Sequence, residues 1–100
     1  PWAGFTVESV GAIRREYLRQ WGVTRTAGCV VLDIIRGCPA FEAGLRPGDV
    51  ITEVNGYAVE YAVDVDYAIW QLFVGDDCAL TIDRQGESRT VRFPIRELAR

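Results

Sequence analysis

Hydrophobic residues occur along the chain in short stretches typical of β-strands, separated by glycine-rich or polar connectors. Residues 29–35 form a nearly continuous β-branched run, which predicts a buried central strand. Residues 5–10 alternate less cleanly and predict a short, half-exposed strand. Further strands are predicted at residues 50–54, 57–59, 78–82 and 90–93.

Residues 11–22 repeat apolar side chains at helical spacing. Ile13, Tyr17 and Trp21 stand at i, i+4 and i+8, and the positions between them include Arg14, Arg15, Glu16 and Arg19. This spacing predicts an amphipathic helix that packs one stripe on the core and leaves a solvated basic face.

Residues 61–74 predict a second helix, which Gly75 is expected to end. Its apolar residues cover much of the circumference, so the helix is either deeply buried or serves two surfaces. The side expected to face inward carries Val65, Ile69, Leu72 and Phe73.

Turn-forming residues are concentrated in residues 37–56. Pro39 suits the first position of a short helix, where a missing N–H is tolerated, and Gly44 suits the left-handed residue that closes it. A turn follows at residues 45–49, and Asn55-Gly56 after the next strand is a strong signal for a two-residue hairpin. We expect Asp49, Asn55 and Gly56 to serve turn geometry rather than chemistry.

The same stretch resembles the signature of bacterial PDZ domains. The motifs that carry the resemblance are Pro39-Ala40, Ala43-Gly44-Leu45, Gly48-Asp49-Val50-Ile51 and Val54-Asn55-Gly56. The order of predicted elements is similar to the circularly permuted bacterial type, in which the ligand-binding strand comes first. The resemblance implies an α+β, β-rich fold: a partly open β-barrel or sandwich of five to six strands, with two main helices and a short one.

The resemblance covers residues 1–100 as a single domain. Within it, residues 1–5 are expected to form the carboxylate-binding loop of the family, and residues 95–100, after Pro94, to form a tail or linker. The chain opens at Pro1 without Met, so we expect a domain cut from a larger protein.

The amino-acid composition argues against several classes of function. The net charge is −3, and a mildly acidic domain without a basic cluster is a poor candidate for binding nucleic acid. No apolar run is long enough for a membrane span, so membrane contact is not indicated. The chain has no His, which removes Ser-His-Asp and Cys-His nucleophilic sets and the commonest zinc ligand. We therefore expect no catalytic residues, no metal and no cofactor in this chain.

The PDZ resemblance also implies a ligand site. PDZ domains bind the C-terminus of another chain as an added strand, and backbone N–H groups of a short loop hold its carboxylate. That loop in the family reads x-Φ-Gly-Φ, where Φ is hydrophobic, and residues 2–5 stand at the corresponding place. The amides of Ala3, Gly4 and Phe5 are the expected carboxylate cradle. The expected peptide groove is lined by Trp2, Phe5, Thr6, Val7, Val65, Ala68, Ile69 and Leu72.

One alternative to this site stays open from the sequence. Residues 2–5 could form a mere turn at the start of the strand, without a ligand role. If they do hold a carboxylate, Ala3 is smaller than the aliphatic residue usual at its position, so we expect a roomy pocket that accepts Leu, Phe or another large apolar last residue.

Among proteins with this domain type, the chain is most similar to the PDZ domains of HtrA-type trypsin-like serine proteases of the bacterial envelope. The similarity rests on the loop at residues 2–5 and on Gly28-Cys29-Val30-Val31 after the first helix. It implies a periplasmic, non-catalytic domain that recognises hydrophobic C-termini of substrates or regulators, or unfolded segments, for an attached protease domain. Alternatives are a site-2-type metalloprotease, a C-terminal processing protease or a secretion protein as host, or an assembly module that does not read free C-termini.

Three cysteines, Cys29, Cys38 and Cys78, lack C-x-x-C spacing. Their settings favour inert packing, although an oxidising compartment could pair two of them. Cys38 precedes the predicted short helix, and because a helix N-terminus favours the thiolate, we expect Cys38 to be the most reactive of the three.

Overall fold

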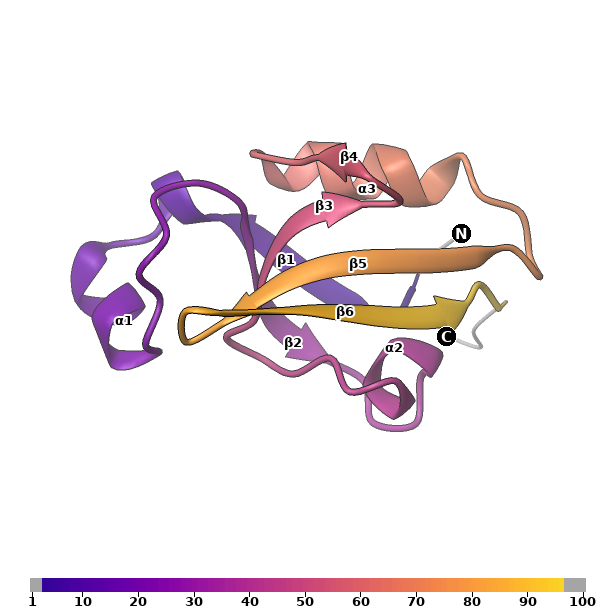
Figure 1. Cartoon of the computed structure of the whole chain (residues 1–100), viewed down its shortest axis with the longest axis horizontal. Coiled ribbons are helices and arrows are strands. Elements are labelled where there is room, and N and C mark those ends of the chain that lie inside the picture. The colour runs from indigo at the N-terminus through magenta and orange to yellow at the C-terminus, as the bar shows by residue number, and fades with distance from the viewer. Residues whose placement is uncertain (1–2, 97–100) are drawn as a thin grey trace.

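The computed structural model describes residues 3–96, which form an antiparallel sheet of six strands with three α-helices (Figure 1). The strands are β1 (Phe5–Ser9), β2 (Cys29–Ile34), β3 (Val50–Val54), β4 (Tyr57–Ala58), β5 (Asp77–Arg84) and β6 (Glu87–Pro94). The helices are α1 (Arg15–Gln20), α2 (Pro39–Glu42) and α3 (Ala62–Trp70), and a 3-10 turn, Val10–Ala12, precedes α1. The predicted α+β class and the number of strands are confirmed.

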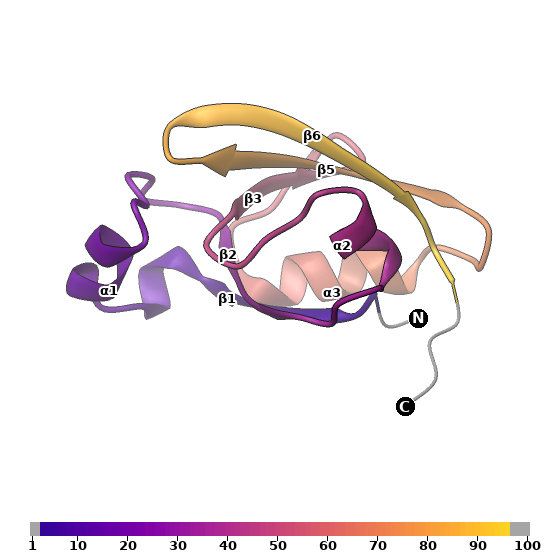
Figure 2. The same ribbon diagram turned by 90° about the horizontal axis from the view of Figure 1, so that it is seen from below.

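The strand order is β1-β2-β3-β5-β6, with β4 paired to β3, so β1 and β6 are the two edges of the sheet. Seen from below, the β5–β6 hairpin lies on the far side of the molecule from β1, and α2 and α3 lie between them (Figure 2). The sheet is therefore curled rather than flat, as expected for a partly open barrel.

The two edges of the sheet meet in the core. The ring of Phe5 on β1 lies edge-to-face against Phe93 on β6, with 6.4 Å between the ring centroids. Val65 and Ile69 of α3 are buried in the same cluster. Burial of aromatic and branched side chains from both edges is the main force that holds the curled sheet closed.

A register shift separates the two halves of the β1–β2 pair. Thr6 lies opposite Asp33, but Val7 lies opposite Val31, so Leu32 is an extra residue on β2. Such an extra residue is a β-bulge, which bends the strand that carries it. Here the bend is in β2.

The short helix and the hairpin turn predicted within residues 37–56 are confirmed. Cys38 precedes Pro39 at the start of α2, and Gly44 has a φ of +110° just beyond its end. Asn55 and Gly56 have φ values of +50° and +84°, which suit a two-residue hairpin of the type that matches strand twist. The side-chain oxygen of Asn55 also accepts a hydrogen bond from the N–H of Ala79, at 2.7 Å.

Asp49 is a structural residue. Its buried carboxylate accepts hydrogen bonds from Arg84 Nε at 2.8 Å and Nη2 at 2.7 Å, and from the backbone N–H of Arg46 at 2.8 Å. Arg84 Nη2 also donates to the carbonyl of Gly44, at 2.7 Å. These bonds fasten the turn after α2 to β5 and raise the pKa of Arg84, chiefly through the hydrogen bonds to Asp49.

The first predicted helix is wrong in length and in its buried side. Ile13 has extended backbone angles, which interrupt the helical phase between the 3-10 turn and α1. The i, i+4, i+8 spacing from Ile13 therefore no longer describes one helix face. Leu18 is the buried residue of α1, whereas Tyr17 and Trp21 are exposed and stack on each other with 6.2 Å between ring centroids.

The second helix is shorter than predicted. It ends at Trp70 because a competing turn forms after it: Phe73 N–H donates to the Asp76 carboxylate at 2.9 Å, and Asp76 N–H donates to the Phe73 carbonyl at 3.0 Å. Phe73, expected to face inward, is 78% exposed.

The predicted tail begins later than residue 95. Ile95 is buried, its N–H donates to the carbonyl of Asp76, and its carbonyl accepts from Gly75 N–H, both at 2.8 Å. It therefore extends the core past β6. Residues 97–100 lie outside the described part of the chain.

Candidate functional site

One side of β1 is free for pairing, because β1 is an edge of the sheet. In antiparallel pairs, residues with both main-chain groups bonded to the neighbour alternate with residues whose groups point away. Ile35 N–H donates to the Gly4 carbonyl at 2.9 Å, so the main chain of Gly4 faces the neighbouring strand. The next residue, Phe5, therefore has main-chain groups that point away from that strand. Its N–H and carbonyl point toward the open edge.

Val7 is the next residue of this kind. Its partner Val31 donates its N–H to the Asp49 carbonyl at 2.9 Å and accepts from Gly48 N–H at 2.8 Å, so the main chain of Val31 is bonded away from β1. Val7 therefore presents its N–H and carbonyl to the open edge, in phase with Phe5.

The open edge is closed at its far end. Ser9 also points outward, but its N–H donates to Oε1 of Glu8 at 2.9 Å. The Ser9 hydroxyl oxygen accepts a hydrogen bond from Ala62 N–H at 3.0 Å, which ties the end of β1 to the start of α3. The accessible part of the edge is thus the half that carries Phe5 and Val7, beside α3.

The loop before β1 turns at Gly4, whose φ of +90° is strained for any residue with a side chain. Ala3 and Phe5 on either side are buried and belong to the main core cluster. Gly4 is buried as well, so the three residues of the predicted carboxylate loop lie against the core. Trp2, the first predicted groove residue, lies outside the described residues.

The predicted groove residues of α3 fall into two groups. Val65 and Ile69 are buried with Phe5, and Val7 packs against the same cluster. Ala68 and Leu72 are half-buried and line a separate hollow of about 670 Å³ between α3 and the β3–β4 hairpin. Thr6 is exposed on β1.

Sequence reasoning missed residues whose role depends on how β1 and α3 meet. Ser9 and Ala62 make the contact between the two elements. Asp66 is exposed and stands one turn after Ala62, on the same side of the helix. The four-residue spacing could have indicated Asp66 only if the side facing β1 had been known.

The charges around this end of the site are acidic. The Asp64 carboxylate accepts hydrogen bonds from the N–H groups of Tyr61 at 2.9 Å and Glu60 at 3.1 Å, and these bonds lower the pKa of Asp64. Behind β1, burial raises the pKa of the Cys29 thiol to about 12, and the nearby carboxylates of Asp64, Asp66 and Glu8 add to the shift.

The described residues offer little for other chemistry. Within residues 3–96, no three His, Cys, Asp or Glu side chains are placed to hold a metal ion. In the same part of the chain, no helix combines the length and the apolar character needed to cross a membrane. The three cysteines are free and buried, and burial also raises the pKa of Cys78, to about 11.

Comparison with known proteins identifies the arrangement. The sequence model of the PDZ domain matches residues 4–95. The chain is 40% identical over 70 residues to a serine protease Do-like HtrA of Lactococcus lactis subsp. cremoris, a match covering 70% of this chain and 17% of that protein. It is 25% identical over 97 residues to a probable periplasmic serine endoprotease DegP-like of Hahella chejuensis, covering 97% of this chain and 20% of that protein.

Two solved structures share the fold. One is the HtrA-type protease AlgW with a decapeptide, with a TM-score of 0.81, 24% identity and coverage of 95% of this chain and 28% of that one. The other is the HtrA3 PDZ domain bound to the phage-derived ligand FGRWV, with a TM-score of 0.75, 16% identity and coverage of 93% and 82%. The chain spans about a fifth or less of the length of the curated relatives it matches.

Proposed function

The chain belongs to the PDZ domain family, and on that premise we propose that it binds the hydrophobic C-terminus of a partner chain. The partner's last residues add to the sheet as a strand along β1, antiparallel to it. The observation that carries the proposal is the free edge itself, where the outward main-chain groups of Phe5 and Val7 stand beside α3.

The loop around Gly4 is the proposed carboxylate site. The amides of Ala3, Gly4 and Phe5 supply N–H groups, with Trp2 next to them in the sequence. The domain's net charge of −3 does not prevent this, because diffuse charge is screened over about 8 Å at physiological salt. Hydrogen bonds to a charged group contribute about 1.5–3 kcal/mol each, so two or three local amides outweigh that repulsion.

The last side chain of the ligand is proposed to rest on the apolar surface between β1 and α3. Burying one such side chain contributes about 2 kcal/mol. Together with the amides, and after the cost of ordering the peptide, this predicts micromolar binding, about −8 kcal/mol. The small side chain of Ala3 favours large apolar last residues such as Leu or Phe.

The proposed host is an HtrA-type serine protease of the bacterial periplasm, whose non-catalytic domain this chain would be. The support is the similarity to HtrA and DegP-like proteins. The domain would select substrates or receive a regulatory peptide for an attached protease domain. Other hosts with similar domains, and an assembly role that ignores free C-termini, are the alternatives.

Titration with C-terminal peptides, followed by backbone amide shifts, tests the binding mode. Each peptide is used free and amidated, and apolar last residues are compared with Ala and with charged ones. We expect shifts at Ala3, Gly4, Phe5 and the Val65–Leu72 face that are lost on amidation. Shifts that ignore amidation would favour docking of internal segments, and a preference for Ala or a charged last residue would refute the pocket.

A second form of the ligand tests strand addition without altering the protein. Peptides are N-methylated at one residue at a time. Because only alternate N–H groups of an added strand face β1, every second methylation should weaken binding about tenfold, and the others should have little effect. A uniform response along the peptide would contradict strand addition.

A further inference from the structure

The hollow between α3 and the β3–β4 hairpin has the composition of a binding site. Its volume is about 670 Å³, and its walls combine apolar side chains such as Val59, Ala68 and Leu72 with two tyrosines and one carboxylate. Asp64 and Ala68 stand four residues apart on α3, and Leu72 follows just beyond its end, so one side of α3 and the segment after it form one wall. The open edge of β1 lies on a different side of this helix, next to Ala62.

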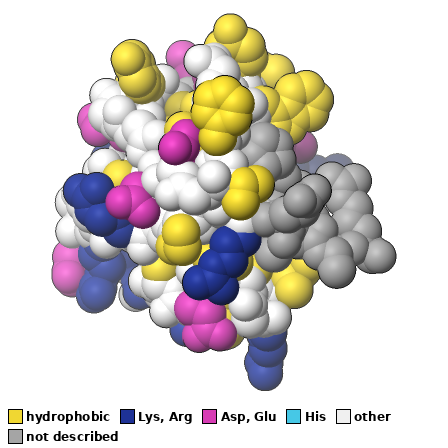
Figure 3. Space-filling view, turned by 90° about the vertical axis from the view of Figure 1, so that its right-hand side faces the viewer, with side chains coloured by type: hydrophobic (Ala, Val, Ile, Leu, Met, Phe, Trp, Pro, Cys, Tyr) yellow, Lys and Arg dark blue, Asp and Glu magenta, His cyan; other side chains and the backbone are white. Residues whose placement is uncertain are grey.

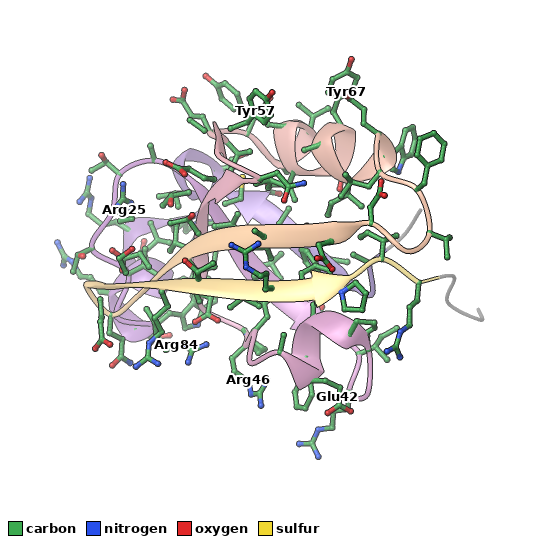
Figure 4. All side chains as sticks on the ribbon, turned by 45° about the vertical axis from the view of Figure 1, so that its right-hand side comes forward. Arg25, Glu42, Arg46, Tyr57, Tyr67 and Arg84 are labelled. Carbon is green, nitrogen blue, oxygen red and sulfur yellow. The ribbon has the colours of Figure 1, made fainter. Side chains whose placement is uncertain are left out.

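The two tyrosines present their rings to solvent at the mouth of the hollow. Tyr57 of β4 is 77% exposed and Tyr67 of α3 is 67% exposed, yet both line the hollow. Figure 4 shows them on the same outer side of the molecule, above β4 and α3, away from the labelled Arg46 and Arg84. Exposed aromatic faces of this kind bind cations and planar groups.

The segment of chain that forms the hollow is acidic, although Arg25 lies in the adjoining hollow. Between Arg46 and Arg84 the sequence contains no basic residue, whereas its acidic residues there are Asp49, Glu53, Glu60, Asp64, Asp66, Asp76, Asp77 and Asp83. In the space-filling view, hydrophobic side chains and single acidic ones occupy the upper part of the face, and the Arg side chains lie lower (Figure 3). A surface with this composition complements an apolar and basic partner.

Asp64 is the carboxylate that lines the hollow. Both of its hydrogen bonds, from Tyr61 and Glu60, end on Oδ2, and within the described residues Oδ1 makes none. Arg25 and Asp64 both line an adjoining hollow, but the ion pair of Arg25 is with Asp83, at 3.6 Å. The Asp64 carboxylate is thus held in place by the helix start, and within residues 3–96 it forms no ion pair with an arginine.

We propose that this hollow binds an arginine side chain from an extended segment of a partner protein. The guanidinium stacks on Tyr67 or Tyr57 and donates to Oδ1 of Asp64, and the methylene groups rest on Ala68 and Leu72. Arginine fits better than lysine because its planar, weakly hydrated group both stacks on rings and donates in a fork. The site is independent of the proposed carboxylate loop, and both can be occupied together.

The probes for the test are N-acetyl-Leu-Arg-amide and N-acetyl-Leu-citrulline-amide. Citrulline has the same shape as arginine without its charge, and the C-terminal amide keeps the carboxylate loop out of the measurement. The wild-type chain is titrated with each probe and followed by amide and methyl shifts. We expect saturable shifts at residues 55–59 and 64–72, with the arginine probe binding about fivefold more tightly.

Two variants and one control locate the contact. Asp64→Asn keeps an oxygen for the helix cap but removes the charge, and Tyr67→Ala removes a ring. Each should weaken the arginine probe about threefold and leave the citrulline probe unchanged or nearly so. Trp70→Ala is the matched control, since Trp70 is equally exposed on α3 but does not line the hollow.

Equal binding of the two probes to the wild type, shifts confined to residues 3–9, or no saturable shift would each overturn the proposal. Shifts confined to residues 3–9 would also bear on the proposed site at β1, because both probes are amidated; the other two results leave binding of free C-termini untouched. If a variant does not fold, the comparison of the arginine and citrulline probes on the wild-type chain still tests whether the hollow binds arginine.

Discussion

The two edges of the sheet, β1 and β6, differ in how they meet solvent. β6 carries Arg89 and Arg92 among its exposed residues, and α2 packs against it. Charged side chains and a covering element are the usual protection of an edge strand against unwanted pairing. β1 has five residues, of which only Thr6 is exposed, and its outward main chain stands beside apolar side chains of α3. The difference indicates that β6 is built to end the sheet and β1 to extend it.

The largest effect should come from breaking the contact that joins the edges. Phe5→Ala should lower the free energy of unfolding by about 3–5 kcal/mol, because it leaves a cavity against Phe93. Urea denaturation measures it. In a cycle with Phe5→Leu and Phe93→Leu, the double variant should lose about 1 kcal/mol less than the sum of the singles. Strict additivity would mean that the edges are not coupled through these rings.

A matched pair of proline variants separates the two edges by function. The N–H of Val7 points to the open edge of β1, and by the same alternation that of Thr90 points to the open edge of β6. Neither proline removes a bond of the sheet. Val7→Pro should weaken binding of a C-terminal peptide at least tenfold, about 1.4 kcal/mol, whereas Thr90→Pro should leave it unchanged.

Both variants need a native amide spectrum for this comparison to count. Equal loss of binding in the two would contradict a ligand site at β1. Loss in Thr90→Pro alone would place the site at β6.

Two cysteines report on the opening of each edge separately. Cys29 pairs with Ser9 of β1, and Cys78 pairs with Phe93 of β6. Their pKa values of about 12 and about 11 keep both thiols protonated at neutral pH, so alkylation requires local opening. We expect Cys38 to react first, and a saturating C-terminal peptide to slow Cys29 about threefold or more without slowing Cys78.

Mass spectrometry of the alkylated chain measures all three rates in one experiment. Equal rates for the three cysteines would refute the expectation for Cys38. Equal protection of Cys29 and Cys78 by the peptide would show that the edges open together.

The smallest expected effect is a loss of local stability at acidic pH. Because the folded pKa of Asp64 lies below its ordinary value of 3.8, its charged form stabilises the start of α3 above that pH. That contribution is lost as the pH falls through the lowered pKa. Since Ala62 ties this end of α3 to Ser9, amides of β1 should lose hydrogen-exchange protection at a higher pH than those of β6. Asp64→Asn should remove this difference in pH between the amides of β1 and β6. If the variant keeps the same pH dependence of exchange, a group other than Asp64 causes the difference.

Local chemistry explains which features of the fold could be predicted from sequence. Pro39 fixes its own φ, and Gly44 and Asn55-Gly56 tolerate the positive φ that these turns need, so helix α2 and the β3–β4 hairpin can be predicted from the residues themselves. The phase of α1 and the end of α3 did not. They depend on the extended backbone at Ile13 and on the capping turn at Asp76, which no apolar periodicity records.

The candidate site divides in the same way. The loop around Gly4 has a family pattern that the sequence shows, whereas the contact of Ser9 with Ala62 arises only because β1 and α3 lie side by side. Ala68 and Leu72 belong to the predicted peptide groove because the sequence predicts a single helix that carries them together with Ile69. Their place in the other hollow depends on where the β3–β4 hairpin lies.

The extra residue Leu32 on β2 affects the spacing of the main-chain groups that β1 would offer to a ligand. Because the irregularity falls on the inner strand, β1 keeps an unbroken two-residue repeat from Phe5 to Ser9. A bound peptide would meet main-chain partners at a constant interval of about 6.8 Å, the distance spanned by two residues of an extended chain. Peptides with different side chains could then pair with β1 in the same register. Selectivity would therefore depend on the C-terminal residue of the peptide rather than on the residues before it.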